Sequence, residues 1–109
     1  MTEKARKYLS DILLAINLVE EFISDTKDFD EYTYDLKTQS AVERQLSIIG
    51  EAVNKFLIEC PECNLKYSLE IVGFRNRLVH AYDKIDNSIV WTILRNYLMP
   101  LKEDIQKLQ

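Results

Sequence analysis

Residues 36–59 read LKTQSAVERQLSIIGEAVNKFLIE, and this stretch decides the fold class. Its apolar side chains recur every three or four residues, as at Val42, Leu46, Ile49 and Val53. This spacing places them on one face of an α-helix, and such a face is stable only when another element covers it. The stretch therefore predicts one long helix of a helical bundle.

Three other segments carry the same helical periodicity, over residues 4–25, 69–82 and 88–108. Residues 28–35 are acidic and aromatic, and they are expected to form a loop with at most one irregular turn. Pro100 falls inside the last helical pattern. Because proline lacks a backbone N–H, we expect it to kink or split that helix.

The two glycines of the chain, Gly50 and Gly73, both fall inside predicted helices. A glycine in a helix interior costs about 1 kcal/mol relative to alanine. The usual compensation is the close approach of another backbone, which a Cβ atom would prevent. We therefore expect a neighbouring helix to pass close to each of them.

The composition favours a single helical domain over residues 1–109. Hydrophobic residues make up 47% of the chain, and only two glycines and two prolines are present for turns. We expect an all-α bundle of four to five helices. The formal net charge of −4 excludes a globally basic surface for nucleic acid, so any RNA contact should be local. No segment approaches the roughly 20 apolar residues of a membrane span, and a cytoplasmic protein without membrane contact is expected.

The two cysteines occur in the sequence Cys60-Pro61-Glu62-Cys63. A structural zinc site needs about four ligands, and the chain offers two cysteines and one distant histidine. A thioredoxin-type redox pair needs a preceding strand pattern, which is missing here. We therefore expect the segment to be a helix end followed by a proline turn, and we expect neither a metal site nor a bound cofactor.

The most reactive stretch is residues 75–82, RNRLVHAY, which contains the only histidine of the chain. Arg75 and Arg77 are suited to holding phosphate oxygens through their planar guanidinium groups. His80 belongs to the one residue type that changes charge near neutral pH without help. Taken alone, such a stretch more often contains a structural histidine and arginines that cap and solvate a helix end than a catalytic site.

The stretch resembles the signature of the HEPN superfamily: an arginine, four intervening residues, a histidine, one residue and a tyrosine. The closest resemblance is to the HepT-like toxins of type VII toxin–antitoxin systems. Residues 38–44 and 48–52 look like the second helix of that family. Residues 89–91 and 98–101 look like its last helix. The resemblance extends over most of the chain.

The resemblance implies a homodimeric HEPN fold that cleaves RNA without a metal ion, at a composite site on the dimer interface. It implies that Arg75 and His80 are the catalytic pair and that Asn76 is the polar residue that supports them. Arg77 is a further candidate RNA contact on the separate ground that any RNA contact of this acidic chain must be local, at its clustered arginines. It also implies that Tyr82 receives AMP from a partner nucleotidyltransferase of the MNT type, which silences the toxin.

Helical geometry constrains how these residues can cooperate. Asn76 lies four positions before His80 and Arg77 lies three before it, so both adjoin the histidine. Arg75 lies five positions before His80, roughly 140° around a helix of 3.6 residues per turn. A straight helix does not aim both at one atom. Either Arg75 reaches around from its side, or it serves the other protomer's half-site.

Glu51 has two interpretations. It lies four residues before Lys55, which predicts an exposed ion pair along one helix face. Alternatively, it orients one arginine of the motif from a neighbouring helix. Glu43 is ambiguous in the same way.

Three functions remain open from the sequence. The leading one is an endoribonuclease toxin with RNA as its substrate. The second is a non-catalytic HEPN subunit that binds a nucleotidyltransferase and presents substrate or nucleotide. The third is a helical dimerisation domain in which the motif only stabilises an interface.

Overall fold

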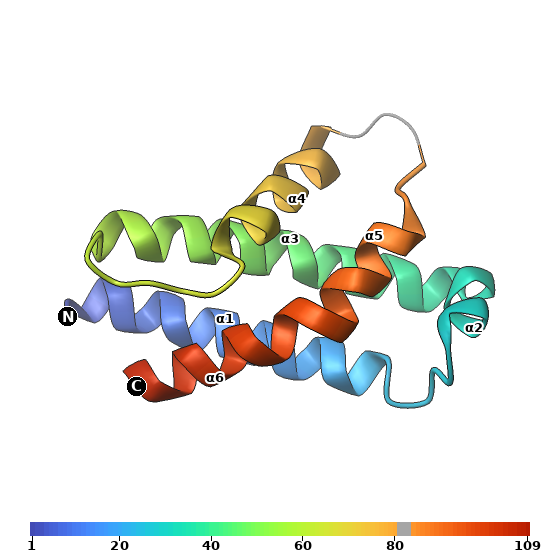
Figure 1. Cartoon of the computed structure of the whole chain (residues 1–109), viewed down its shortest axis with the longest axis horizontal. Helices are drawn as coiled ribbons and strands as arrows, with labels where there is room; N and C mark the ends of the chain where they lie inside the picture. Colours follow the sequence, from blue (N-terminus) through green and yellow to red (C-terminus); the bar gives the residue numbers. More distant parts are fainter. Residues whose placement is uncertain (81–83) are drawn as a thin grey trace.

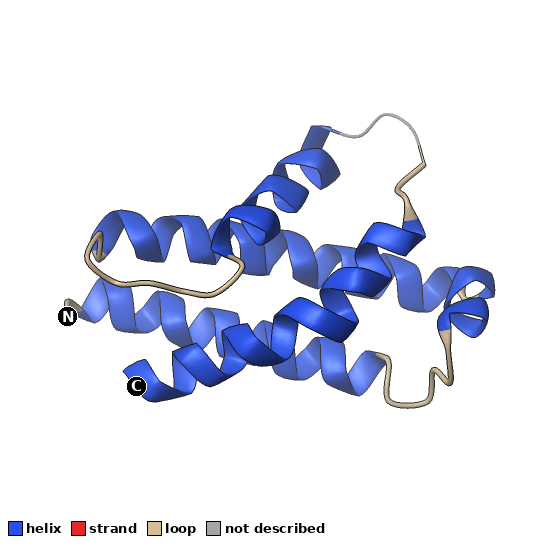
Figure 2. Cartoon of the chain, viewed as in Figure 1, coloured by secondary structure: helices blue, strands red, loops and turns tan. Residues whose placement is uncertain are grey.

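The computed structural model describes residues 1–80 and 84–109, and every regular element in these ranges is helical (Figures 1 and 2). In chain order the elements are α1 (Glu3–Phe22), α2 (Phe29–Tyr34), α3 (Leu36–Glu59), α4 (Ser68–His80), α5 (Asn87–Thr92), the π-helical turn η1 (Ile93–Tyr97) and α6 (Leu98–Leu108). The last three follow one another without a break, so the predicted all-α bundle of four to five helices is confirmed. None of the described helices is both long and apolar enough to cross a membrane.

The two long helices α1 and α3 pack along each other and form the centre of the bundle (Figure 1). The bounds of α3 coincide with those predicted, whereas α1 ends at Phe22, three residues before the predicted end at Asp25. Side chains cap both starts. Thr2 Oγ1 accepts a hydrogen bond of 3.0 Å from Ala5 N, and Asp35 Oδ1 accepts one of 3.0 Å from Thr38 N. Such caps satisfy backbone donors that have no partner inside the helix.

The apolar stripes of the long helices meet in one hydrophobic core, as their periodicity predicts. α6 closes this core from a third side, and its inward face is also fully buried. The largest completely buried aliphatic side chains are Leu9, Ile12, Ile16, Val19, Val42, Ile49, Val53, Val90, Leu101 and Ile105.

The expectation of a loop at residues 28–35 was wrong, because this segment contains the short helix α2. Asp28 caps its start by accepting a hydrogen bond of 3.0 Å from Glu31 N. Tyr32 is completely buried, and its ring centroid lies 5.5 Å from that of Trp91 on α5. The helix is too short to show a periodic pattern, and contacts with residues far away in the sequence stabilise it.

The C-terminal helix is irregular just before Pro100, as predicted. In η1 the N–H of Leu98 donates to the carbonyl of Ile93, five residues back instead of four. This extra residue forms a π-helical bulge between α5 and α6 within one continuous helical run. π-Helical turns are rare, and they occur frequently at functional sites.

The two glycines differ in the space that surrounds them. A Cβ atom on Gly50 would lie 2.9 Å from Cγ of Arg75 and 3.1 Å from the carbonyl oxygen of Ile71. Gly50 therefore allows α4 to cross α3 closely, as expected. The same expectation for Gly73 was wrong, since an added Cβ would meet no described atom within 4 Å beyond the adjoining residues and backbone of its own helix.

Candidate functional site

Arg75 stands where α4 crosses α3, with its aliphatic stem lying over Gly50. Its Nη1 donates a hydrogen bond of 3.2 Å to Oδ1 of Asn76, and its Nη2 lies 3.9 Å from Oε2 of Glu51. Its Nε is buried and has no hydrogen-bond partner within the part of the chain that the structure describes. The side chain is 29% exposed, so the packed stem holds a guanidinium group whose end still meets solvent.

Glu51 contacts the partners that both of its interpretations name. Its Oε1 lies 3.1 Å from Nζ of Lys55, and its other oxygen faces Arg75. The hydrogen bond with Lys55 is the main cause that lowers the pKa of Glu51, and the positive charge of Arg75 adds to it. The carboxylate therefore links the exposed Lys55 to the arginine of the motif.

A small cavity of about 220 Å³ opens between α3 and α4 around this cluster. Two cations, Arg75 and Lys55, and two amides, Asn54 and Asn76, line it. These donors suit an oxyanion such as a phosphate, and Glu51 balances one of the positive charges. Asn54 was not singled out from the sequence. Its only signal is its position one helical turn after Gly50, on the face that α4 approaches.

Arg77 and His80 lie on another side of α4. Both side chains are exposed, and Arg77 lines a groove between α4 and the helix that follows. α4 remains helical through His80, so the separation of roughly 140° between Arg75 and His80 applies to this chain. Asn76 accepts a hydrogen bond from Arg75. The motif is therefore divided between two faces of α4, with Arg75 on one face and Arg77 and His80 on the other. Tyr82, the candidate modification site, lies outside the described residues.

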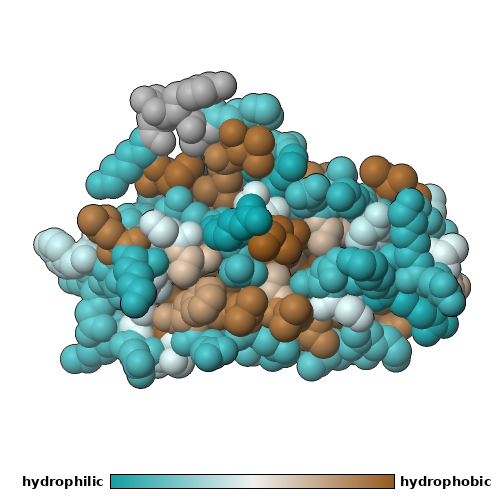
Figure 3. All heavy atoms as spheres, turned by 180° about the vertical axis from the view of Figure 1, so that it is seen from behind, coloured by the Kyte–Doolittle hydropathy of each residue, from teal (hydrophilic) through white to brown (hydrophobic). Residues whose placement is uncertain are grey.

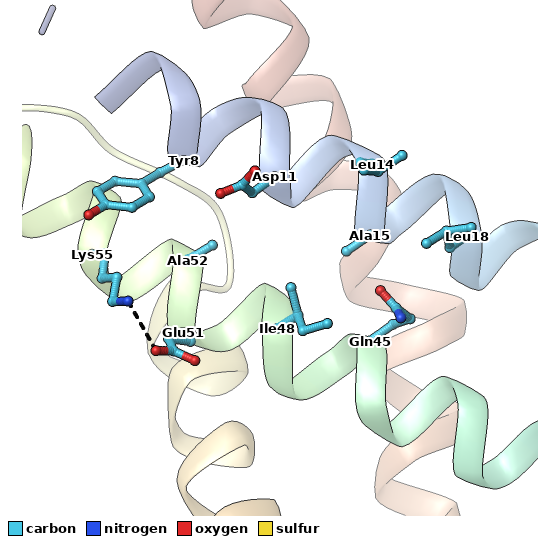
Figure 4. A pocket seen from close by; sticks show the side chains of 10 residues that line it. All are labelled: Tyr8, Asp11, Leu14, Ala15, Leu18, Gln45, Ile48, Glu51, Ala52 and Lys55. Atoms are coloured by element: carbon cyan, nitrogen blue, oxygen red, sulfur yellow. Dashed lines mark ion pairs between the residues drawn. The ribbon is translucent and has the colours of Figure 1, made fainter. Parts of the chain in front are cut away.

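A second hollow, of about 410 Å³, runs between α1 and α3 and shares Glu51 and Lys55 with the Arg75 cluster (Figure 4). Apolar side chains form most of it, including Leu14, Leu18 and Ile48. Leu14 is 63% exposed, which is unusual for a leucine in the middle of a long helix. Seen from behind the view of Figure 1, apolar side chains interrupt the polar surface over α1 and α3 (Figure 3). An apolar surface next to a polar cluster is typical of a protein contact face.

Cys60 and Cys63 are joined by a disulfide at the end of α3. With Glu62 they form the only grouping of potential metal-ligating side chains within the described residues. Sulfur atoms in a disulfide are not thiolates, so this grouping does not act as a zinc site in this state. The bond itself was not predicted, because the spacing alone does not show whether the two sulfur atoms pair.

Comparison with known proteins gives a consistent result. The family described as "Ribonuclease HepT-like" matches residues 12–108. A relative from Thermococcus cleftensis, named "Probable ribonuclease HepT", is 36% identical over 100% of this chain and 99% of its own length. A Methanocaldococcus jannaschii protein named as a candidate RNase is 35% identical over 93% of both chains. A second one is 37% identical over 84% of this chain and 75% of its own length. No solved structure gave a significant match.

Proposed function

Because the chain belongs to the HepT-like ribonucleases of the HEPN superfamily, we propose that it is a toxin that cleaves RNA without a metal ion, at a site shared by two copies of the chain. It is an endoribonuclease by family. The toxin role, the dimer, the partner and the assignment of residues belong to the proposal. The observation that carries the assignment is the anchored Arg75, whose stem is fixed over Gly50 while its guanidinium end stays accessible.

RNA contains its own nucleophile, since the 2′-OH can attack the adjacent phosphate and expel the 5′-oxygen. That step needs a base for the hydroxyl, an acid for the leaving oxygen and fixed positive charge for the transition state. His80 supplies proton transfer, and Arg75 supplies the fixed charge. Asn76 holds the Arg75 guanidinium through its hydrogen bond of 3.2 Å.

The number of ionisable groups favours a homodimer, although a water molecule or Tyr82 could supply the second proton-transfer role. The chain has one histidine, whereas the reaction has two proton-transfer roles. Two copies that bring both His80 side chains to one centre provide the base and the acid together. The apolar hollow between α1 and α3 offers a contact face for a second copy beside the Arg75 cluster, with which it shares Glu51, whereas His80 lies on another side of α4. A second copy seated there would approach that cluster directly.

Regulation by a nucleotidyltransferase antitoxin of the MNT type completes the proposal. Transfer of AMP from ATP to the Tyr82 hydroxyl, with release of pyrophosphate, would add a phosphodiester anion and a bulky nucleoside two residues after His80. The added phosphate would compete with the phosphates of RNA for the arginines. Inhibition then needs no change of fold. This regulation places the protein in the cytoplasm, where its RNA substrate and ATP are found.

Incubation of the purified protein with single-stranded RNA, with and without EDTA, tests the activity. Cleavage should proceed equally in both, and a His80→Ala preparation controls for contaminating nucleases. A folded protein that leaves RNA intact but binds a nucleotidyltransferase would contradict the proposal. That result would favour the alternative of a non-catalytic HEPN subunit that presents substrate or nucleotide to its partner.

A further inference from the structure

A groove of about 550 Å³ separates α4 from α5 and η1, on the side of α4 that carries Arg77 and His80. Its volume falls within the range of small-molecule sites, roughly 300–1,000 Å³. Phe74, Ile89 and Ile93 form an apolar floor. Ser88, Thr92 and Tyr97 also line it, and the hydroxyls of Ser88 and Thr92 already donate hydrogen bonds to Asp86 Oδ1 and to the carbonyl of Ser88. The groove thus combines an apolar surface with a few polar groups, which is typical of a site that binds an aromatic ligand with polar edges.

The two ends of the groove differ in chemistry. α4 and α5 run in opposite directions, so the helices on the two sides of the groove are antiparallel (Figure 1). At one end Arg77 is close enough to Asp86 that its positive charge lowers the pKa of that carboxyl, although a hydrogen bond from Ser88 has the larger effect. At the other end Tyr97 and Glu70 stand beside the start of α4. One end of the groove therefore carries Arg77 with the Asp86 carboxylate nearby, and the other end carries the ring of Tyr97 together with Glu70.

The ring of Tyr97 at the aromatic end is stacked on a residue with an unusual backbone conformation. The ring of Tyr97 stacks on that of Tyr67, with centroids 4.3 Å apart and planes at 16°. Tyr67 adopts a left-handed backbone conformation with φ of 63°, which non-glycine residues rarely adopt. Such conformations persist where the surroundings enforce them, and they cluster at ligand sites. Tyr67 does not line the groove, so it braces Tyr97 without filling the space.

Gly73 is the residue that keeps the groove open. It costs helix stability, and no described atom lies within 4 Å of where its Cβ would stand. Contacts within the described chain therefore give no reason for a glycine here, in contrast to Gly50. A longer side chain at this position would project into the groove that Gly73 lines.

We infer that this groove binds one nucleotide of the RNA substrate, with the base against Tyr97 and the phosphate at Arg77. This inference rests on the proposed function and identifies where its substrate lies. Stacking on aromatic side chains is the general way in which proteins hold unpaired bases. Arg77 attracts the phosphate, with Asp86 nearby, and Glu70 at the aromatic end would accept hydrogen bonds from base amino groups, which together orient the nucleotide. Gly73, Arg77 and His80 follow at i, i+4 and i+7 along one helix face, so the phosphate end leads toward His80.

The test is binding of a short fluorescent RNA made of 2′-O-methyl nucleotides, which cannot be cleaved through its 2′ position. Gly73→Leu should weaken binding by about fivefold to 150-fold, the range for the loss of one stacked base. Gly73→Ala adds only a methyl group and should bind nearly as the original protein does. Tyr97→Leu should weaken binding, and Tyr97→Phe, which keeps the ring, should not.

Each outcome decides the inference. Unchanged affinity of Gly73→Leu, or no binding by the unmodified protein, would overturn it. So would sedimentation showing that Gly73→Leu turns a dimer into a monomer, because a second copy would then occupy the groove. A protein that binds this RNA through the groove but cleaves no RNA would retain the inference and refute the proposed function. A protein that cleaves RNA while Gly73→Leu binds normally would do the reverse.

Discussion

Gly50 on α3 lies directly against the side chain of Arg75 on α4, so closely that a Cβ atom there would stand 2.9 Å from the arginine Cγ. The backbone carbonyl oxygen of Ile71 would lie 3.1 Å from the same Cβ atom. The position of Arg75 therefore depends on the absence of a side chain on the neighbouring helix. This dependence connects the packing of the bundle with the proposed chemistry.

Replacing each glycine by alanine should give opposite results. Gly50→Ala should destabilise the fold by about 1–3 kcal/mol, the usual cost of overpacking, and should lower RNA cleavage by displacing Arg75. Gly73→Ala should stabilise it by up to about 1 kcal/mol, because alanine is the better helix former and meets no described atom. Urea unfolding monitored by circular dichroism measures both. Equal effects of the two substitutions would contradict this account of the helix crossing.

Removing either proposed catalytic side chain should abolish measurable cleavage while the fold remains. Arg75→Ala removes a fixed cation, which by analogy with a lost oxyanion donor costs about 10²–10³ in rate. His80→Ala removes proton transfer, worth typically about 10²–10⁴. Initial rates on a labelled RNA, together with far-ultraviolet circular dichroism, check both variants. Full activity in a folded His80→Ala protein would exclude the proposed role of the histidine.

Mixing the original protein with His80→Ala tests whether two histidines work in one centre. If both are needed, a mixed dimer is inactive, and activity falls with the square of the active fraction. An equal mixture should then retain about a quarter of the activity instead of about half, provided that subunits exchange freely. Refolding the two chains together ensures this exchange. Activity proportional to the active fraction would show that each histidine acts alone.

The sequence predicted the parts of this structure that depend on local pattern. The bounds of α3 and the disruption before Pro100 follow from periodicity and from the missing N–H of proline. Helix α2 was missed because Tyr32 is buried against Trp91, a contact between segments far apart in the chain.

In the candidate site, too, local pattern predicts some relationships and not those that depend on contacts between distant segments. Helical spacing predicts that Arg75 and His80 diverge, and the contact between Glu51 and Lys55 also follows from it. Spacing does not show that Gly50 faces Arg75, nor that Gly73 faces an open groove. These relationships depend on how α4 crosses its neighbours, which no single helix determines.

Glu43 makes stability depend on pH. Its carboxyl is partly buried, and this burial raises its pKa. The charged form is therefore disfavoured in the fold, so stability is greatest below the unfolded pKa of about 4.3 and falls as pH rises through the higher folded value. Glu43→Gln should raise the melting temperature at pH 7, and the gain should shrink as the pH approaches about 4. Glu103→Gln, at an exposed position, is the control and should change little. A gain that grows toward acid pH would contradict this assignment.

Tyr82 is the proposed site of silencing, and its role can be tested separately from cleavage. Incubation with the cognate nucleotidyltransferase and ATP should add the mass of AMP to the peptide that contains Tyr82, as measured by mass spectrometry. Tyr82→Phe keeps an aromatic ring but lacks the acceptor oxygen, so it should resist modification. Its toxicity should then escape the partner, provided that the hydroxyl is not needed for cleavage. Tyr97→Phe is the matched control and should still be modified. An adduct on Tyr97 in place of Tyr82 would refute the assignment and leave the nuclease proposal intact.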